Sequence, residues 1–157
     1  MPRDLRMSRM LHVLIHMDRH VPLATSEQIS KMISTNPVVV RRMMGGLRDR
    51  GIVTSEKGHG GGWRLSSSLA EVTLRDVYEA VGAPPLFNIG PDASPSECLV
   101  EKAVDAQLAA SLRDAEERLL AQFSEIKVED LARDFESRLA DVQQDARGTC
   151  DAADHRT

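Results

Sequence analysis

Apolar residues recur at helical spacing in the first part of the chain. Over residues 5–20 they stand mostly three or four positions apart, which predicts a helix with one buried face that ends before Pro22. The segment TSEQISKMIS places Gln28 three residues after Thr25. That spacing is typical of a capping box and predicts a second, short helix.

A third helix is predicted to begin at Asn36, a good N-cap, with Pro37 at the first helical position, and to end at Gly51. Helical periodicity divides its residues between two faces. The face expected in the core carries Val40, Met44 and Leu47. The face expected outside carries Val38, Arg41, Arg42, Gly45 and Arg48.

A β-hairpin is expected next, because the β-prone runs GIVTSE and WRLS flank the glycine cluster of residues 58–62. A phosphate-binding loop is a poorer interpretation of this cluster, since it lacks a G-K-[ST] ending and a strand-like segment follows it. After the hairpin, Thr73 and Asp76 have capping-box spacing and predict a helix that ends at Gly82.

The second half of the chain predicts a long helix with Ser94 as its N-cap and Pro95 as its first residue. One apolar stripe runs along it and predicts a dimerisation surface, because a long helix leaving a small domain must bury its apolar face. The residues assigned to this surface are Val104, Leu108, Leu112, Leu119 and Phe123. A break is expected at residues 126–128, before a second amphipathic stretch.

The predicted fold class is mainly α with a small β-hairpin: a winged helix-turn-helix domain plus a long dimerisation helix. The expected boundaries are a DNA-binding domain over residues 1–83, a linker over 84–95, a helical dimerisation region over 96–145 and a disordered tail over 146–157.

Charge is divided unevenly along the chain. Residues 1–65 carry 11 Lys and Arg against 5 Asp and Glu, whereas residues 66–157 carry 9 against 19. A basic half on a chain of net charge −4 favours a local polyanion-binding surface. No apolar run is long enough for a membrane span or a secretory signal, so a cytoplasmic protein without membrane contact is expected.

These features together resemble the Rrf2 (BadM-type) family of bacterial winged helix-turn-helix transcription regulators. The resemblance lies in EQISKMISTNPVVVRRMMGGLRDRGIV, SEKGHGGGWRL and EVTLRDVYEAVG, and extends over about residues 5–125. It implies a homodimer whose paired third helices enter successive major grooves of double-stranded DNA, with the hairpins at the flanking minor groove or backbone.

Several members of that family hold an iron–sulfur cluster through three cysteines at the start of the long helix. Only Cys98 occupies this region here, so the sequence resembles the cluster-free branch and no cofactor is expected. Cys98 near a helix N-terminus is a possible thiol or redox sensor, because the helix dipole favours the thiolate. The alternative is a small apolar residue under the loop.

The residues predicted to contact DNA lie in the second helix, the third helix and the hairpin. They are Ser26, Asn36, Pro37, Val38, Val39, Arg41, Arg42, Arg48, Lys57, His59 and Arg64. An arginine can pair bidentately with guanine, and one of Arg41 and Arg42 is expected to read a base while the other holds a phosphate. The alternative is that both only solvate an exposed face.

Three other features leave alternatives open. Gly45 and Gly46 indicate close approach of the helix to another helix or to DNA, or else a weak point in an exposed helix. His12, His16 and His20 have ligand-compatible spacing, but no convergent carboxylate or cysteine is evident, so no metal site is assigned. Trp63 is expected to anchor the hairpin rather than to touch DNA.

The predicted function is a dimeric, sequence-specific DNA-binding transcription regulator, most simply a repressor that responds to an unidentified signal. A protein–protein interaction adaptor without specific DNA binding is the alternative, although an adaptor has no need of so basic an N-terminal half. No catalytic motif is present in the sequence, so an enzyme is not expected.

Overall fold

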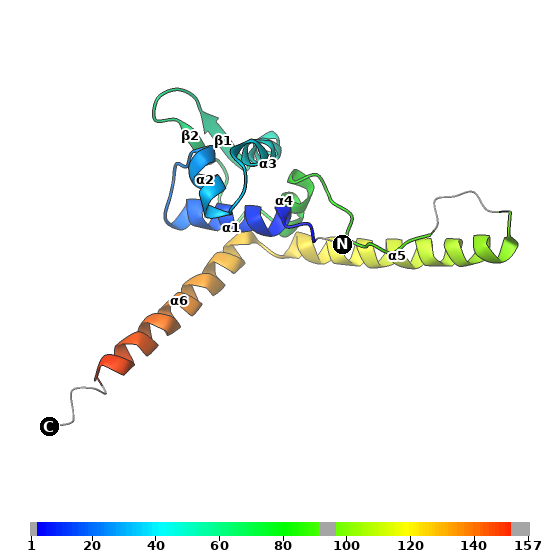
Figure 1. The fold of residues 1–157 in the computed structure, drawn as a ribbon. Helices are drawn as coiled ribbons and strands as arrows, with labels where there is room; N and C mark the ends of the chain where they lie inside the picture. The colour runs from blue at the N-terminus through cyan, green and yellow to red at the C-terminus, as the bar shows by residue number, and fades with distance from the viewer. Residues whose placement is uncertain (1–2, 92–96, 152–157) are drawn as a thin grey trace.

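The computed structural model describes residues 3–91 and 97–151, with the backbone alone over 143–151. A winged-helix body sits where two long helices meet, and these helices diverge from it like the arms of a V (Figure 1). The elements of the body are α1 (Arg6–Arg19), α2 (Ser26–Met32), α3 (Pro37–Asp49), β1 (Val53–Glu56), β2 (Gly62–Leu65) and α4 (Leu74–Ala80). The arms are α5 (Leu99–Glu125) and α6 (Val128–Asp151).

The predicted starts of α2, α3 and α4 are confirmed by their caps. Thr25 Oγ1 accepts the Gln28 N–H at 3.1 Å, and Gln28 Oε1 accepts the Thr25 N–H at 2.8 Å, which closes the capping box. Asn36 Oδ1 accepts the Val38 N–H at 2.7 Å. Thr73 forms a second capping box with Asp76. Each cap satisfies backbone donors that the first helical turn leaves without partners.

The core of the body takes side chains from α1, α2, α3, the hairpin and α4. α1 contributes four buried side chains, and the face of α3 predicted to lie inside is buried with one addition, Met43. The buried residues are Met10, Val13, Leu14 and Met17 from α1 and Val40, Met43, Met44 and Leu47 from α3. Because these residues follow the helical period, the opposite face of α3 remains exposed.

The hairpin has the predicted antiparallel pairing, with Val53 opposite Leu65 and Glu56 opposite Gly62. It is tied to the chain before α2, because the backbone of Trp63 exchanges two hydrogen bonds with Ala24, at 2.8 and 3.0 Å. Trp63 is 8% exposed and its indole N–H donates to Ser26 Oγ at 3.0 Å. The expectation that Trp63 anchors the hairpin is confirmed.

Gly46 is where α3 comes closest to α4. A Cβ at this position would lie 2.0 Å from the Ala80 carbonyl oxygen, so only glycine fits without moving one of the two helices. A Cβ at Gly45 would meet nothing within 4 Å. Close helix approach therefore explains Gly46, and Gly45 lies on the outer side of the same helix.

The long helix begins later than predicted. α5 starts at Leu99 with Cys98 as its N-cap, whereas the predicted cap and first residue, Ser94 and Pro95, lie outside the described residues. The predicted break is confirmed, and backbone pairing holds it in place. Leu74 N–H donates to Ile126 O at 3.0 Å, and Val128 N–H donates to Val72 O at 2.9 Å. This pairing fixes the point where the two arms meet the body.

α6 leaves the body after its first turns. Val128 and Ala132 are fully buried, and Glu129 accepts from Arg19 Nη2 at 2.8 Å. The helix then continues to Asp151, so the predicted disordered tail is helical over residues 146–151 and outside the described residues beyond. No proline interrupts this stretch, so no missing backbone N–H ends the helix before residue 146.

Replacing Gly46 by Ala should lower the free energy of unfolding by about 1–3 kcal/mol, because the added methyl group overpacks the α3–α4 contact. Gly45→Ala is the matched control and should raise it by about 0.5–1 kcal/mol through higher helix propensity. Urea unfolding followed by far-UV circular dichroism measures both. Equal effects of the two substitutions would contradict the close approach.

Candidate nucleic-acid interface

The outer face of α3 presents apolar and basic side chains together. Val38 is 67% exposed and Val39 is 40% exposed, next to the exposed Arg41 and Arg42. These positions occupy the first turns of the helix, where a recognition helix presents side chains to base edges. The structure brings these four predicted residues to one surface.

Arg41 and Arg42 differ in their side-chain hydrogen bonds and ion pairs. Arg41 Nη2 lies 2.8 Å from Glu27 Oε1 on α2, in an ion pair that is exposed on both sides. Arg42 has no hydrogen bond or ion pair to any described residue. An exposed ion pair contributes little to stability, but it does hold a side chain in one orientation. Arg42 is therefore the arginine available to a ligand.

Arg48 lies about two turns beyond Arg41 on α3. Its guanidinium pairs with the neighbouring Asp49, with Nη2 at 3.0 Å from the carboxylate. The pair is exposed and leaves the guanidinium partly neutralised at the C-terminal end of the helix. Arg48 therefore resembles Arg41 in being paired with a carboxylate.

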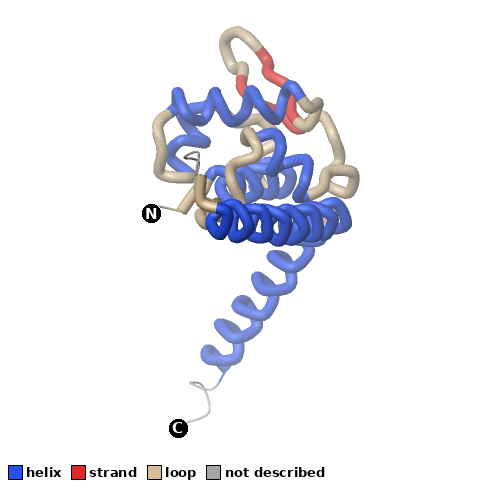
Figure 2. The backbone as a smooth tube through the Cα atoms, turned by 90° about the vertical axis from the view of Figure 1, so that its right-hand side faces the viewer, coloured by secondary structure: helices blue, strands red, loops and turns tan. Residues whose placement is uncertain are grey.

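The hairpin, here called the wing (residues 53–65), projects from the body beside α3 (Figure 2). Its tip has the positive φ angles expected of the glycine cluster, with Gly58 at +97° and Gly60 at +77°. Lys57 and His59 are exposed at this tip. Arg64 is also exposed but pairs across the hairpin with Glu56, 2.7 Å away.

Three of the predicted contact residues have structural tasks. Ser26 is 7% exposed and its hydroxyl accepts the Trp63 indole N–H, so the assignment of its side chain to DNA contact is wrong. The Asn36 carbonyl oxygen caps α3, and Pro37 forms the first residue of that helix. Asn36 keeps an exposed side chain beside the recognition face.

Sequence reasoning missed two residues next to this face. Glu27 orients Arg41, and Arg6, at the start of α1, donates from Nη1 to Val81 O at 3.0 Å. Arg6, Arg42 and Gly82 line a hollow of about 630 Å³ between α1, α3 and α4. The 75 residues that separate Arg6 from Val81 explain why no local pattern pointed to it.

Comparison with known proteins decides the class of this chain. A family model described as Rrf2, an iron-dependent transcriptional regulator, matches residues 4–134. The chain belongs to the Rrf2 family. Rrf2 proteins are transcriptional regulators with a DNA-binding winged helix and are not enzymes.

Two Rrf2-like relatives come from Bacillus subtilis, and both are assigned as HTH-type transcriptional regulators. YwnA is 36% identical over 106 residues, which cover 66% of this chain and 76% of YwnA. YwgB is 40% identical over 57 residues, and that match spans only 36% of each protein.

Solved structures share the fold. A transcriptional regulator from Lactobacillus plantarum superposes with a TM-score of 0.72 at 21% identity, covering 92% of this chain and 98% of that one. T. potens IscR has a TM-score of 0.58 at 14% identity, covering 88% and 90% of the two chains. CymR, the global cysteine regulator of B. subtilis, has a TM-score of 0.54 at 18% identity, covering 85% and 97%.

α5 of this Rrf2 protein has two apolar sides. On one side, the middle of the helix shares a hollow with the loop before it, lined by Pro85, Phe87 and Leu112. Further along the helix, the Phe123 ring lies 6.2 Å from the Tyr78 ring. Leu119 is half-buried on the same helix. Leu112 and Phe123, both assigned to the dimer surface from the sequence, are half-buried against their own chain, so their place in a dimer surface stays a prediction.

The other side of α5 has no cover from the described residues. Leu99 is 79% exposed, Val100 is 73% exposed and Val104 is 58% exposed. With Leu108 they line a shallow, apolar groove of about 720 Å³. Of the predicted dimerisation residues, Val104 and Leu108 lie on this outward surface, here called the α5 groove (Leu99, Val100, Ala103, Val104, Gln107, Leu108 and Ser111).

Cys98 is exposed at the N-terminus of α5, directly before the α5 groove. The backbone N–H groups of Glu101 and Val100 lower the pKa of its thiol, because they donate to the thiolate. The helix terminus therefore makes this thiol more acidic than an ordinary cysteine.

An iron–sulfur cluster does not fit these residues. Such clusters are held by several cysteine thiolates, with histidine as a replacement in some centres. Cys98 is the only cysteine between residues 1 and 149, and no group of three or more His, Cys, Asp or Glu side chains within the described residues could hold a metal ion.

In the part of the chain that the structure describes, none of the helices combines the length and the apolar character of a membrane span.

The lowered pKa of Cys98 predicts alkylation at lower pH than for a free cysteine. In a Cys150→Ser background, the iodoacetamide rate of the folded protein should rise with a midpoint below about 8.5, the ordinary thiol value. The lower pKa means that the reactive thiolate is already populated at that pH. The same protein unfolded in urea is the control, and identical midpoints would contradict the helix-terminus effect.

Proposed function

We propose that this Rrf2 protein is a homodimeric, sequence-specific DNA-binding repressor whose affinity for its site changes with a thiol signal. The observation that carries the proposal is the exposed face of α3, where Arg42 has no partner in the described structure and two valines stand beside it. This face combines a bidentate donor for guanine with apolar groups that suit thymine methyls.

Arg42 is the base-reading arginine in this proposal, and Arg41 is a phosphate contact. The reason is the 2.8 Å ion pair between Arg41 and Glu27, which directs the Arg41 side chain towards α2. This ion pair restricts the side-chain rotation that Arg41 would need to reach a base. Within the described residues no ion pair restricts Arg42, so its side chain can enter the major groove of the DNA.

The wing supports the same docking. Its position is fixed relative to α3, because Trp63 joins β2 to Ala24 and Ser26 by backbone and side-chain hydrogen bonds. Lys57 and His59 at the tip would then meet phosphate or the minor groove beside the site that α3 occupies. Both regions lie in the basic part of the chain, residues 1–65.

Dimerisation is proposed to use the α5 groove. Leu99, Val100 and Val104 are large apolar side chains in water, and two α5 helices packed against each other would cover them. A dimer presents two α3 helices, so the DNA site would be pseudo-palindromic with half-sites about one helical turn apart. The simplest outcome of such binding at a promoter is steric exclusion of polymerase.

Cys98 is the proposed signal position. It directly precedes Leu99 and Val100 of the α5 groove, so oxidation or adduct formation at its thiol would add bulk and polarity at the proposed dimer surface. A shift of the two α5 helices would change the distance between the α3 helices. The dimer would then bind DNA more weakly, because its two α3 helices would no longer match the spacing of the half-sites.

Arg42→Ala should weaken binding to the preferred duplex by about 1–3 kcal/mol, roughly 5- to 150-fold, because a bidentate base contact is lost. The duplex is first selected from a random pool, and fluorescence anisotropy then measures the affinity. Binding should also fall steeply with salt in both proteins, since phosphate contacts release counterions.

Arg118→Ala is the control for this experiment. Arg118 is an exposed arginine on α5 that pairs only with Asp114, so its loss removes one positive charge outside the proposed interface. If the Arg42→Ala protein selects the same bases with unchanged affinity, the base-reading assignment fails. If neither protein prefers any duplex at moderate salt, the chain acts as a protein–protein adaptor instead.

Val104→Glu should convert the dimer to a monomer, because a buried, unpaired carboxylate in an apolar interface is strongly unfavourable. Sedimentation velocity at micromolar concentration measures the change, and far-UV circular dichroism confirms that the fold is intact. Arg113→Glu, on another exposed part of α5, should leave the oligomeric state unchanged. A dimer that survives Val104→Glu would rule out the α5 groove as its interface.

A further inference from the structure

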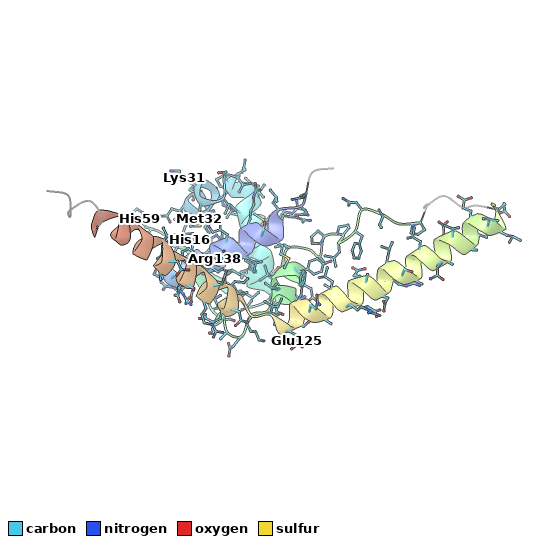
Figure 3. All side chains as sticks on the ribbon, turned by 90° about the horizontal axis from the view of Figure 1, so that it is seen from below. His16, Lys31, Met32, His59, Glu125 and Arg138 are labelled. Atoms are coloured by element: carbon cyan, nitrogen blue, oxygen red, sulfur yellow. The ribbon has the colours of Figure 1, made fainter. Side chains whose placement is uncertain are left out.

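Three of the five histidines of the chain lie on α1 and at its C-cap, outside the α3 face, the wing and the α5 groove. Their spacing is i, i+4 and i+8, and their rings follow one another along the helix. The ring centroids of His12 and His16 are 4.7 Å apart, and those of His16 and His20 are 5.6 Å apart. His16 is labelled in Figure 3.

The first pair has the separation of two imidazoles that share one metal ion. With a metal–nitrogen distance of about 2.1 Å and a nitrogen–metal–nitrogen angle of roughly 90–110°, the ring centroids lie about 4.5–5.2 Å apart. The His12–His16 distance falls inside this range, and the His16–His20 distance falls outside it. Two histidines four residues apart on a helix are also the metal-binding part of the H-E-x-x-H motif.

The third histidine has another contact. The His20 ring meets Phe135 of α6 edge to face, with centroids 6.3 Å apart, at the place where α6 lies against α1. His20 is therefore assigned to the contact between α1 and α6 rather than to the ion.

A metal ion must also be able to reach the two imidazoles from solvent. His12 is exposed and His16 is half-buried, so an ion can reach them from solvent.

The nearby carboxylates are engaged elsewhere. Asp18 and Glu129 pair with Arg19. A Glu136 carboxylate oxygen lies 2.7 Å from Arg19 Nε in an ion pair without hydrogen-bond geometry. No third His, Cys, Asp or Glu joins the pair within the described residues. Water would complete the coordination, which suits ions that accept mixed nitrogen and oxygen ligands, namely Ni²⁺, Cu²⁺ and Zn²⁺.

We propose that His12 and His16 bind one divalent late-transition-metal ion per chain. The two imidazoles act as a chelate on the exposed side of α1, and water fills the remaining positions. The site uses none of the residues assigned to DNA or to the α5 groove. Its presence therefore does not depend on the proposed regulatory function.

The test is isothermal titration of the full chain with NiCl₂ and, separately, ZnCl₂ at pH 7.5. Cys98→Ser and Cys150→Ser are present throughout, so that thiolates do not contribute. One ion per chain is expected. His12→Gln and His16→Gln should each weaken binding by at least about tenfold, because the second ligand of a chelate binds in an intramolecular step. Binding should also weaken by about tenfold or more at pH 5, where protons compete for the imidazoles.

His20→Gln is the matched control, because His20 is the neighbouring histidine at the C-cap of α1 and supplies no ligand, and this variant should change the affinity by less than about threefold. All three residues are exposed or half-buried, and far-UV circular dichroism verifies the fold of each variant. Absence of binding at millimolar metal would overturn the proposal. Equal losses in all three variants, or none in His12→Gln and His16→Gln, would overturn the assignment of the ligands.

Discussion

Burial of one face of α3 is the constraint on which the rest of the structure depends. Val40, Met43, Met44 and Leu47 turn into the core with the apolar side of α1. Because an α-helix repeats every 3.6 residues, fixing this face also fixes the opposite one. The basic and apolar side chains at the start of α3 are exposed as a direct consequence, and Gly46 sets how closely the helix can lie against α4.

The wing shares this rigid body through Trp63. A two-stranded hairpin is marginally stable alone, and here it gains a buried indole, a side-chain hydrogen bond and two backbone hydrogen bonds to Ala24. The buried donor would be costly without the Ser26 hydroxyl, because an unsatisfied polar group in a core loses its hydration. The spatial relation between the wing tip and α3 therefore rests on residues that do not reach the surface.

α5 connects the body to the surface proposed for dimerisation. Its apolar residues are spread over two sides: Leu112 and Phe123 meet their own chain, while Val100 and Val104 face solvent. The helix thus has one side that contacts the body and one side that faces solvent. Because both belong to the same helix, a movement of the outward surface would also move the side that contacts the body. Cys98 stands at the junction between the loop and this helix, where a chemical change would act on both.

Local patterns in the sequence were enough for much of the fold and of the candidate site. The two capping boxes, the Asn36–Pro37 start, the glycine-rich hairpin and the two faces of α3 depend on neighbours a few residues apart, and the structure has all of them. The same local patterns identified the Rrf2 family, since the recognition helix and the wing stand at a fixed distance in the chain.

Tertiary structure alone decided which partner each side chain has. It placed Ser26 under Trp63, Glu27 beside Arg41, and Leu112 and Phe123 against their own domain. Helical periodicity shows that a face is apolar, but not whether the same chain or a second copy covers it. Contacts between residues far apart in the sequence depend on how the helices pack, and no pattern within one helix contains that information.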